Sequence, residues 1–356
     1  FAAIIREHGP DAVGFYISGQ LTTEDYYVFN KLAKGLIGTN NVDTNSRLCM
    51  SSAVAGYKQT LGADAPPACY DDLALAQTVL ITGSNMAWAH PVLFRRLEDA
   101  RRANPAQKLI VVDPRRTETA AMADLHLPLL PGSDVALYHG LLHLMLWEGC
   151  TKPDYIAAHT TGFDALKQLA GASYAPEAVA KLTGIEAKTI VDLAKAFAAA
   201  KKPLAVCGRG SGRIPGGLQE VLAVHYLNAL AGNINQPGGV IAVPEPEYID
   251  WPEPEMDAVA SRGVQQPRLD GAGRDSFPLA RYLLNRLPEA LSAGASAPVQ
   301  ALFVSGANPV YSLPDTQAVA KAFFKVPLIV SLSSYMDETA AMAHYILPSH
   351  VHLERY

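Results

Sequence analysis

The feature that most constrains the fold of this chain is an internal repeat. Residues 78–85, TVLITGSN, match residues 301–308, ALFVSGAN, and residues 108–128 match residues 326–348. The two longer segments share ETAAMA and both end in Leu-Pro. A repeat of this length predicts two copies of one structural unit, and therefore two similar ligand-binding halves.

Each copy has the pattern of a strand, a small-residue turn, a helix and a second strand. The helix of the first copy, PVLFRRLEDARRA at residues 91–103, has apolar residues on one face and charges on the other. Strands of the same style occur in DAVGFYISGQ at residues 11–20 and in PLAVCGRG at residues 203–210. The chain is therefore predicted to be α/β, with two Rossmann-like lobes built on parallel sheets.

The position of the repeat predicts a discontinuous domain. The final copy should pair with the strand FYIS near the start of the chain, so residues 1–46 and 298–356 are expected to form one lobe. Residues 47–297 are expected to form an inserted lobe. Within it, the Pro-, Gly- and acid-rich residues 244–275 predict a long irregular surface loop.

Composition excludes several classes of function. The net charge of −5 and the pI of about 6.1 provide no basic patch for nucleic acid. The four cysteines form no C-x-x-C, which argues against a zinc knuckle or an iron–sulfur run. The longest apolar stretch, residues 136–150, contains histidines and is too short for a membrane span, so it predicts a buried helix.

Cys49 stands between a turn-rich loop and an apolar pattern at helical spacing. The pattern predicts that Cys49 occupies the first turn of a helix that stops at Gly62. The helix dipole would there stabilise a thiolate suited to a transition metal or to nucleophilic chemistry. The alternative is an ordinary core cysteine.

Glycines and acids follow the predicted strands. Gly83 would let the backbone approach a phosphate, and Asp113 could accept hydrogen bonds from a ribose. Asp134, in PGSD, could bind the two donors of a guanine edge, or it could simply cap the next helix. In CGRGSGR, Arg209 and Arg213 suit an anion, although a solvent-facing loop has the same composition.

Taken together in one order, the loop cysteine, ITGSNMAWAHP, VVDPRRTETAAMADLHLPLLPGSD and ALAGNINQPGGV make the chain resemble the molybdopterin oxidoreductases of the dimethyl-sulfoxide-reductase superfamily. The resemblance covers the whole sequence. It implies two molybdopterin guanine dinucleotides that hold one molybdenum or tungsten. Cys49 matches the position of the protein ligand to the metal.

The resemblance also assigns further site residues. Gln20 and Asn45 resemble pterin contacts. Arg209, in the loop whose composition suits an anion, is expected to orient an oxyanion substrate. One guanosine diphosphate arm is expected at Thr82, Gly83, Ser84, Asn85, Met86, Asp113, Arg115, Gly132, Ser133 and Asp134. The other is expected at Cys207, Ser211, Gly306, Asn308, Ser331 and Arg355.

Within the superfamily, SRLCMSSAVAGY resembles assimilatory and periplasmic nitrate reductases. Met50 follows the metal ligand where formate dehydrogenases usually have His, so nitrate reduction to nitrite is the expected activity. The later segments LNALAGNINQPGG and MDETAAMAHYILPSHVHLERY resemble polysulfide- or thiosulfate-reductase-like members. Formate dehydrogenase, polysulfide or thiosulfate reductase, and a cofactor-free scaffold of an electron-transfer complex remain the alternatives.

The resemblance further implies parts and partners outside the sequence. We expect a fragment of a longer protein, whose [4Fe-4S] cluster would precede Phe1 and whose C-terminal barrel would follow Tyr356. A small oxyanion substrate and an electron-donor protein or redox subunit are the expected partners, with no nucleic acid and no membrane span. A cytoplasmic location is expected, with the periplasm as the alternative, and the isolated fragment could exist without cofactor.

Overall fold

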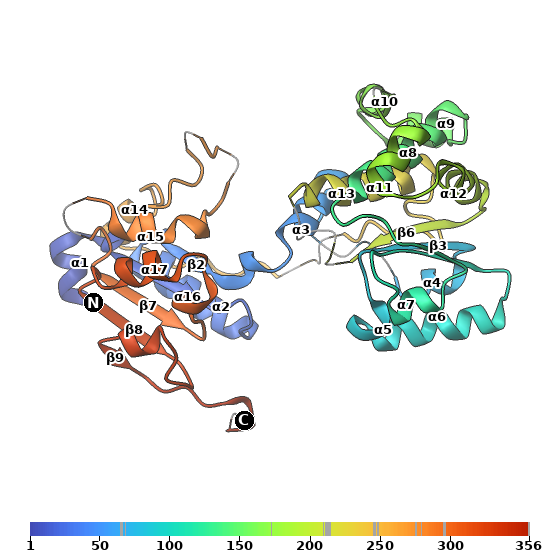
Figure 1. The fold of residues 1–356 in the computed structure, drawn as a ribbon. Coiled ribbons are helices and arrows are strands. Elements are labelled where there is room, and N and C mark those ends of the chain that lie inside the picture. The colour runs from blue at the N-terminus through green and yellow to red at the C-terminus, as the bar shows by residue number, and fades with distance from the viewer. Residues whose placement is uncertain are drawn as a thin grey trace. The chain divides into compact units, whose positions relative to one another are not determined.

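The chain forms two compact units, drawn in Figure 1. Unit 1 comprises Phe1–Cys49 and Ile249–Tyr356, and unit 2 comprises Met50–Tyr248. The structure is a computed structural model, and it describes residues 1–64, 67, 69–171, 173–208, 210, 215–244, 247, 249–274, 276–278, 280–294 and 297–354.

Unit 1 is built on a five-stranded parallel sheet in the order β2-β1-β7-β8-β9. Its strands are β1 (Val13–Ile17), β2 (Val42–Thr44), β7 (Ala301–Ser305), β8 (Leu328–Leu332) and β9 (Tyr345–Ile346). The predicted pairing of FYIS with the last repeat is confirmed, because β1 pairs in parallel with β7 from Val13 opposite Ala301 to Ile17 opposite Ser305.

Helices cover both faces of this sheet because successive strand residues point to opposite sides. Val304 and Ile329 pack with Phe323 in one buried cluster, while Val13 and Phe15 belong to another. The helical segments of unit 1 are α1 (Ala2–His8), η1 (Pro10–Ala12), α2 (Thr23–Asn30), η2 (Lys31–Ile37), η3 (Asn45–Leu48), α14 (Ala258–Gly263), η5 (Leu284–Arg286), α15 (Leu287–Ser292), α16 (Pro309–Ser312), α17 (Thr316–Phe323), η6 (Ala340–Met342) and η7 (His352–Glu354).

Unit 2 is built on a four-stranded parallel sheet in the order β5-β4-β3-β6. Its strands are β3 (Thr78–Thr82), β4 (Lys108–Val112), β5 (Leu125–Leu127) and β6 (Pro203–Cys207). Its helices are α3 (Ser51–Leu61), α4 (Asp72–Leu75), α5 (Met86–Ala89), α6 (Pro91–Ala103), α7 (Glu118–Ala121), α8 (Asp134–Trp147), α9 (Pro153–His159), α10 (Phe163–Gly171), α11 (Pro176–Thr183), α12 (Ala187–Ala199) and α13 (Gly217–Leu230).

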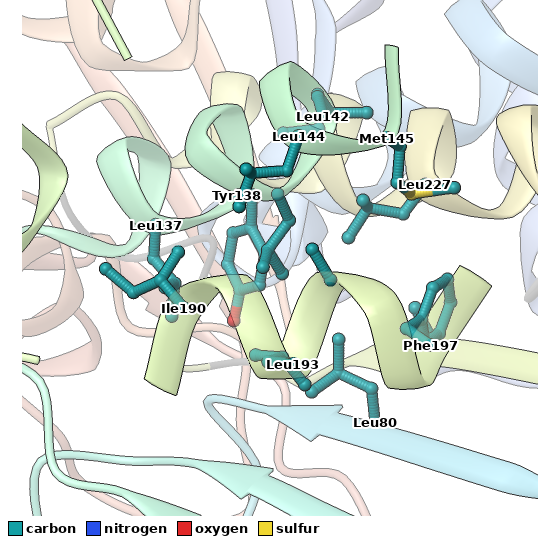
Figure 2. Close-up of a cluster of buried hydrophobic side chains, with 14 of the residues drawn as sticks. Leu80, Leu137, Tyr138, Leu142, Leu144, Met145, Ile190, Leu193, Phe197 and Leu227 are labelled. Carbon is teal, nitrogen blue, oxygen red and sulfur yellow. The ribbon is translucent and has the colours of Figure 1, made fainter. Parts of the chain in front are cut away.

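The core of unit 2 also has two layers. Leu80 packs against α8, α12 and α13, and Figure 2 shows Tyr138 and Leu193 in this cluster. Val79 and Ile81 face the other side, where Leu97 of α6 covers them. The predicted amphipathic helix (α6) and the predicted buried helix (α8) are both confirmed. Among the described residues, no helix has the length and apolar character needed to cross a bilayer.

Each sheet reverses its strand order at one point. In unit 2 the chain runs from β3 outward to β5, and β6 then returns to the other side of β3. In unit 1, β1 lies beside β7, and β8 and β9 continue on the far side of β7. These two strand pairs are topological switch points, where a crevice opens beyond the carboxyl ends of the strands.

The predicted boundary at residue 298 is wrong. Residues 249–297 belong to unit 1, and Arg268 supplies the main physical reason. Its guanidinium donates to the carbonyl oxygens of Asn40 and Val42, each at 2.8 Å, and pairs with Asp43 and Asp270. The predicted loop 244–275 therefore also contains α14 and a segment fastened to β2.

Candidate functional site

The switch point of unit 2 brings two glycine-containing turns together. The N–H of Gly208 donates to the carbonyl of Thr82 at 2.9 Å, and the N–H of Gly210 donates to the carbonyl of Gly83 at 3.1 Å. A Cβ at Gly208 would lie 2.5 Å from the Cβ of Ser84, and one at Gly210 would lie 2.7 Å from the Gly83 oxygen. Only glycine permits this close approach of the two turns.

Two carboxylates stand at the same edge of unit 2. Asp113 follows β4, and its Oδ1 accepts the N–H of Arg115 at 2.9 Å. Asp134 is the first residue of α8, and burial raises its pKa, with the charge of Asp113 adding to the effect. The pair therefore provides hydrogen-bond acceptors in a crevice that already carries negative charge.

The polar side chains beneath this edge are buried. The Tyr138 hydroxyl donates to the Thr82 hydroxyl, and both side chains are fully buried. Burial raises the pKa of Cys207 to about 12, with the charge of buried Glu220 adding to it, so the Cys207 thiol is protonated at neutral pH. Cys207 lies opposite Thr82 in the sheet register, and thus beside a residue of the first set of predicted contacts.

The switch point of unit 1 repeats the same backbone geometry. The N–H of Ser18 donates to the carbonyl of Ser305 at 2.8 Å, as Gly208 does to Thr82. Gly306 has φ of 62° and Gly83 has φ of 56°, and each donates its N–H to the last residue of the neighbouring strand. The two crevices are therefore equivalent points of the repeat.

The segment that leads to Cys49 is fastened to the turn after β1. The N–H of Gly19 donates to Asn45 Oδ1 at 2.6 Å, and a Cβ at Gly19 would lie 2.5 Å from the Cβ of Ser46. Gln20 is exposed beside this contact, and its N–H donates to Ser18 Oγ at 3.1 Å. The 3₁₀ helix η3 thus positions the cysteine that follows it.

The prediction that Cys49 occupies the first turn of a helix is wrong. Cys49 caps the C-terminus of η3 with φ −89° and ψ −84°, and α3 begins only at Ser51. Met50, the N-cap residue, also has non-helical angles. Cys49 is exposed, and none of the four cysteines, all of which are described, forms a disulfide. Its exposed side chain also contradicts the interpretation as a core cysteine.

An asparagine occurs at the same place in both copies of the repeat, Asn85 and Asn308. Its side chain joins the turn after the first strand to the segment after the second strand by hydrogen bonds. Asn85 Nδ2 donates to Glu118 Oε2 at 3.2 Å, and Asn85 Oδ1 accepts the Thr119 hydroxyl at 2.9 Å. Thr119 in turn accepts the N–H of Ala87 at 3.0 Å. Unit 1 contains the same arrangement around Asn308. These side chains therefore shape the crevices from within the protein.

Several predicted contacts lie where only their backbone could reach a ligand. Thr82 is fully buried, and Met86 packs in the core with 5% of its surface exposed. Ser331 is 1% exposed within β8, whereas Ser333 occupies the place that matches Asp113. Both Asp113 and Ser333 accept the N–H of the residue two positions later.

The remaining predicted residues divide into two groups. Gly132, with φ of 83°, is exposed, and Ser133 is half-buried and donates to the Leu130 carbonyl at 2.6 Å. Arg209, Ser211 and Arg355 lie outside the described residues. Arg213, the second arginine of the predicted anion loop, does too.

Sequence reasoning missed three residues that the structure places at these crevices. Gly19 and Ser18 follow β1, and Ser333 follows β8. Val112 and Leu332 are the last residues of the second strand in the two copies of the repeat. An alignment of the copies that matches these two strand ends places Ser333 opposite Asp113. The close contact of Gly19 with Ser46 has no local sequence signal.

The described residues contain no cluster of three His, Cys, Asp or Glu side chains that could hold a metal ion.

Comparison with known proteins identifies the family of this chain. The family model for molybdopterin oxidoreductases matches residues 1–356. The chain belongs to the molybdopterin oxidoreductase family. A nitrate reductase of Klebsiella oxytoca is 36% identical over 97% of this chain and 40% of its own length. The F420-dependent formate dehydrogenase 1 subunit alpha of Methanococcus maripaludis is 31% identical over 97% of this chain and 51% of its own length.

A solved structure shows the same fold. Acetylene hydratase from Pelobacter acetylenicus matches with a TM-score of 0.78 and 23% identity, over 99% of this chain and 51% of that protein. The chain thus spans about half or less of the length of the molybdopterin oxidoreductases and the fold relative that it matches. The predicted α/β fold with an internal repeat is confirmed.

Membership of the molybdopterin oxidoreductase family implies a molybdenum–molybdopterin cofactor. The residues present fit such a group in three respects. Left-handed glycines, Gly83 and Gly306, directly follow β3 and β7, Asp113 and Asp134 offer acceptors, and Cys49 offers an exposed soft donor.

Proposed function

We propose that this chain is the catalytic region of a molybdenum enzyme that reduces nitrate to nitrite. The observation that carries the proposal is the similarity to a nitrate reductase along almost the entire chain, at 36% identity. The sequence around Cys49, in which Met50 follows the cysteine, supports the same substrate.

The cofactor is proposed to be a pair of molybdopterin guanine dinucleotides, one for each switch point. The equivalence of the two crevices supports this pairing, since Gly83 and Gly306 have the same backbone conformation beside matching strands. Bound there, molybdenum or tungsten would supply the two-electron chemistry, and the protein would supply orientation and access.

In this proposal Cys49 provides the protein's ligand to the metal. Its thiol is exposed and is held at the end of η3 by the contact between Gly19 and Asn45. Asp134 binds the donor edge of one guanine, and Asp113 accepts hydrogen bonds from the ribose of the same arm. Such donors favour the charged carboxylate and so offset the burial that raises the pKa of Asp134.

The second candidate function is formate oxidation. The similarity to the Methanococcus maripaludis formate dehydrogenase subunit supports it at 31% identity. Met50 argues against it, because the resemblance discussed above places His after the ligand in formate dehydrogenases. Polysulfide or thiosulfate reduction and a cofactor-free scaffold are the further alternatives. A cofactor-free scaffold would not need an exposed cysteine at a fixed position. The exposure of Cys49 and the hydrogen bond that holds the segment before it therefore argue against the scaffold.

The electrons are proposed to come from a donor protein or a redox subunit, and a [4Fe-4S] cluster would belong to a part of the protein outside residues 1–356. Cell fractionation tests the expected cytoplasmic location against a periplasmic one.

The deciding experiment uses the full-length natural protein from a host able to assemble the cofactor. Molybdenum and tungsten are measured by mass spectrometry, and GMP is measured after acid release. We expect about one metal and two GMP per chain. Turnover is then assayed with nitrate, formate and polysulfide, using a reduced or oxidised viologen dye. Formate turnover without nitrate turnover would replace the proposal by the second candidate.

Two cysteine variants test the ligand role. Cys49→Ala is expected to abolish nitrate turnover while the circular dichroism spectrum stays unchanged. Cys69→Ala is the matched control, because Cys69 is also exposed but lies away from both crevices in sequence. Full turnover in Cys49→Ala would refute the ligand role of this residue.

A further inference from the structure

Unit 2 contains a second concave site at the opposite edge of its sheet. The cavity has a volume of about 480 Å³, and Lys152, Lys201, Lys202 and the loop from Ala231 to Gly239 line it. Lys202 directly precedes β6, so the cavity lies at the amino ends of the strands, away from the crevice described above. We propose that this lysine cavity binds a small phosphate-bearing anion.

The backbone that carries two of the lysines is fixed. Lys201 and Lys202 connect α12 to β6. The N–H of Lys201 donates to Gln77 Oε1 at 2.7 Å, and the carbonyl of Lys202 accepts the N–H of Gln77 at 2.8 Å. The positions of both residues are therefore set by the start of β3.

Two glycines leave space for the aliphatic parts of the lysine side chains. A Cβ at Gly232 would lie 3.0 Å from Lys152 Cγ, and a Cβ at Gly238 would lie 3.0 Å from Lys202 Cδ. Both glycines also have left-handed backbones, with φ of 68° and 85°. The glycine-rich stretch thus brings the lysine side chains against the loop, a feature that the proposed activity does not use.

The loop itself is anchored by buried groups. Asp72 Oδ1 accepts the N–H of Gly238 at 2.8 Å, and Asn233 Nδ2 donates to the carbonyl of Pro203. The Tyr155 hydroxyl donates to the carbonyl of Ile234 at 3.2 Å. A site with a fixed frame loses little conformational entropy when a ligand binds.

The charge of the cavity is unbalanced. Three lysines face one carboxylate, Asp154, among the lining residues. Within the described part of the chain, none of the three lysines forms an ion pair. The chain as a whole has a net charge of −5, so this cavity is a local positive site on a negative protein. A bound anion would relieve the repulsion among the ammonium groups.

The lining also includes a buried amide that fixes the loop. Asn233 lines the cavity, is 4% exposed, and donates from its Nδ2 to the carbonyl of Pro203 at the start of β6. The volume is in the range of small-ligand sites, and lysines bind phosphates as point charges.

The test is calorimetric titration of the full-length, cofactor-loaded protein at low ionic strength. The probes are inorganic pyrophosphate, orthophosphate and glycerol 3-phosphate. We expect saturable binding of at least one probe at one site per chain. The variant Lys201→Gln/Lys202→Gln is expected to bind about tenfold or more weakly. Lys321→Gln, an exposed lysine of α17 in unit 1, is the control and should bind like the wild type.

The outcomes separate the ligand classes. Tighter binding of glycerol 3-phosphate than of orthophosphate supports an organic phosphate, and the reverse order supports free phosphate. Equal affinity in the double variant and the wild type overturns the proposal, as does the absence of saturable binding for all three probes. Thermal unfolding of each variant verifies that it is folded. Because the readout is binding, failure here is distinct from failure of the proposed nitrate reduction.

Discussion

Asn85 and Asn308 make the same side-chain hydrogen bonds at equivalent points of the two units. Asn85 Oδ1 accepts the hydroxyl of Thr119 at 2.9 Å, and Asn308 Oδ1 accepts the hydroxyl of Thr339 at 2.7 Å. In both units the amide Nδ2 donates to the glutamate that precedes the threonine. The repeat therefore retains these residue types because they fasten one turn to the next.

Removing this lock should weaken each unit. Asn308→Ala leaves the hydroxyl and the N–H of Thr339 without their acceptor, so we expect the free energy of unfolding to fall by about 1–2 kcal/mol. Asn85→Ala should behave similarly. Asn30→Ala, which removes an exposed bond to the Tyr26 carbonyl, is the control and should cost under about 0.5 kcal/mol. Urea unfolding measures all three, and equal losses in Asn308→Ala and Asn30→Ala would contradict the lock.

Gly19→Ala should disturb the segment before Cys49 without unfolding the protein. The new Cβ would lie 2.5 Å from the Cβ of Ser46 and 2.9 Å from its Cα, so η3 must move. In the full-length protein we expect loss of bound molybdenum and of nitrate turnover, with circular dichroism unchanged. Gly14→Ala is the matched control, since its nearest neighbours lie at 3.4 Å. Normal molybdenum content in Gly19→Ala would show that the position of η3 does not matter.

Arg268→Ala should be the most damaging substitution outside the two cores. Arg268 is 17% exposed and bridges Asp43 and Asp270, which are 10% and 8% exposed. Its loss leaves two buried carboxylates without their cation, and we expect a cost of about 3 kcal/mol. Arg102→Ala breaks an exposed pair with Asp99 and should cost under about 1 kcal/mol. Similar urea midpoints for the two variants would disprove the structural role of Arg268.

His225→Leu should make the protein less sensitive to acid. Burial lowers the pKa of His225 to about 4, and neither ring nitrogen has a hydrogen-bond partner among the described residues. Below about pH 6.5 the unfolded chain binds a proton that the folded chain does not bind until about pH 4, so stability falls across that range. His225→Leu removes this difference in proton binding. The free energy of unfolding of His225→Leu, measured relative to the wild type, is therefore expected to be about 2 kcal/mol higher at pH 5 than at pH 7.5.

Urea unfolding at both pH values tests the histidine prediction. His159→Leu, at an exposed position of α9, is the matched control. A constant difference in stability between His225→Leu and the wild type at the two pH values would show that His225 does not titrate as described.

The sheet architecture is predictable from the sequence because apolar strands and their turns are local patterns that occur twice. The pairing of β1 with β7 follows from the same repeat, although about 290 residues separate Val13 from Ala301. The residues at the strand ends, such as Gly83, Asp113 and Gly306, are also placed correctly relative to the strands.

The failures arise where distant contacts set the backbone. α3 begins after Cys49 rather than before it, and the segment before the cysteine is held by Asn45, which contacts Gly19. The domain boundary is wrong because Arg268 bonds to Asn40, 228 residues earlier. Sequence alone predicts a contact at Ser331, while the end of β8 places Ser333 at the edge of the sheet.

The sheet of unit 1 takes its strands from both ends of the sequence, and this arrangement determines the order in which the two units can fold during synthesis. β1 is synthesised before unit 2, but its partner β7 follows only after the whole of unit 2. Unit 2 can therefore complete its sheet while the edge of β1 that pairs with β7 is still open. β1 is as fully buried as β3, the first strand of unit 2, so the unpaired edge of β1 could mispair with β3 until β7 emerges.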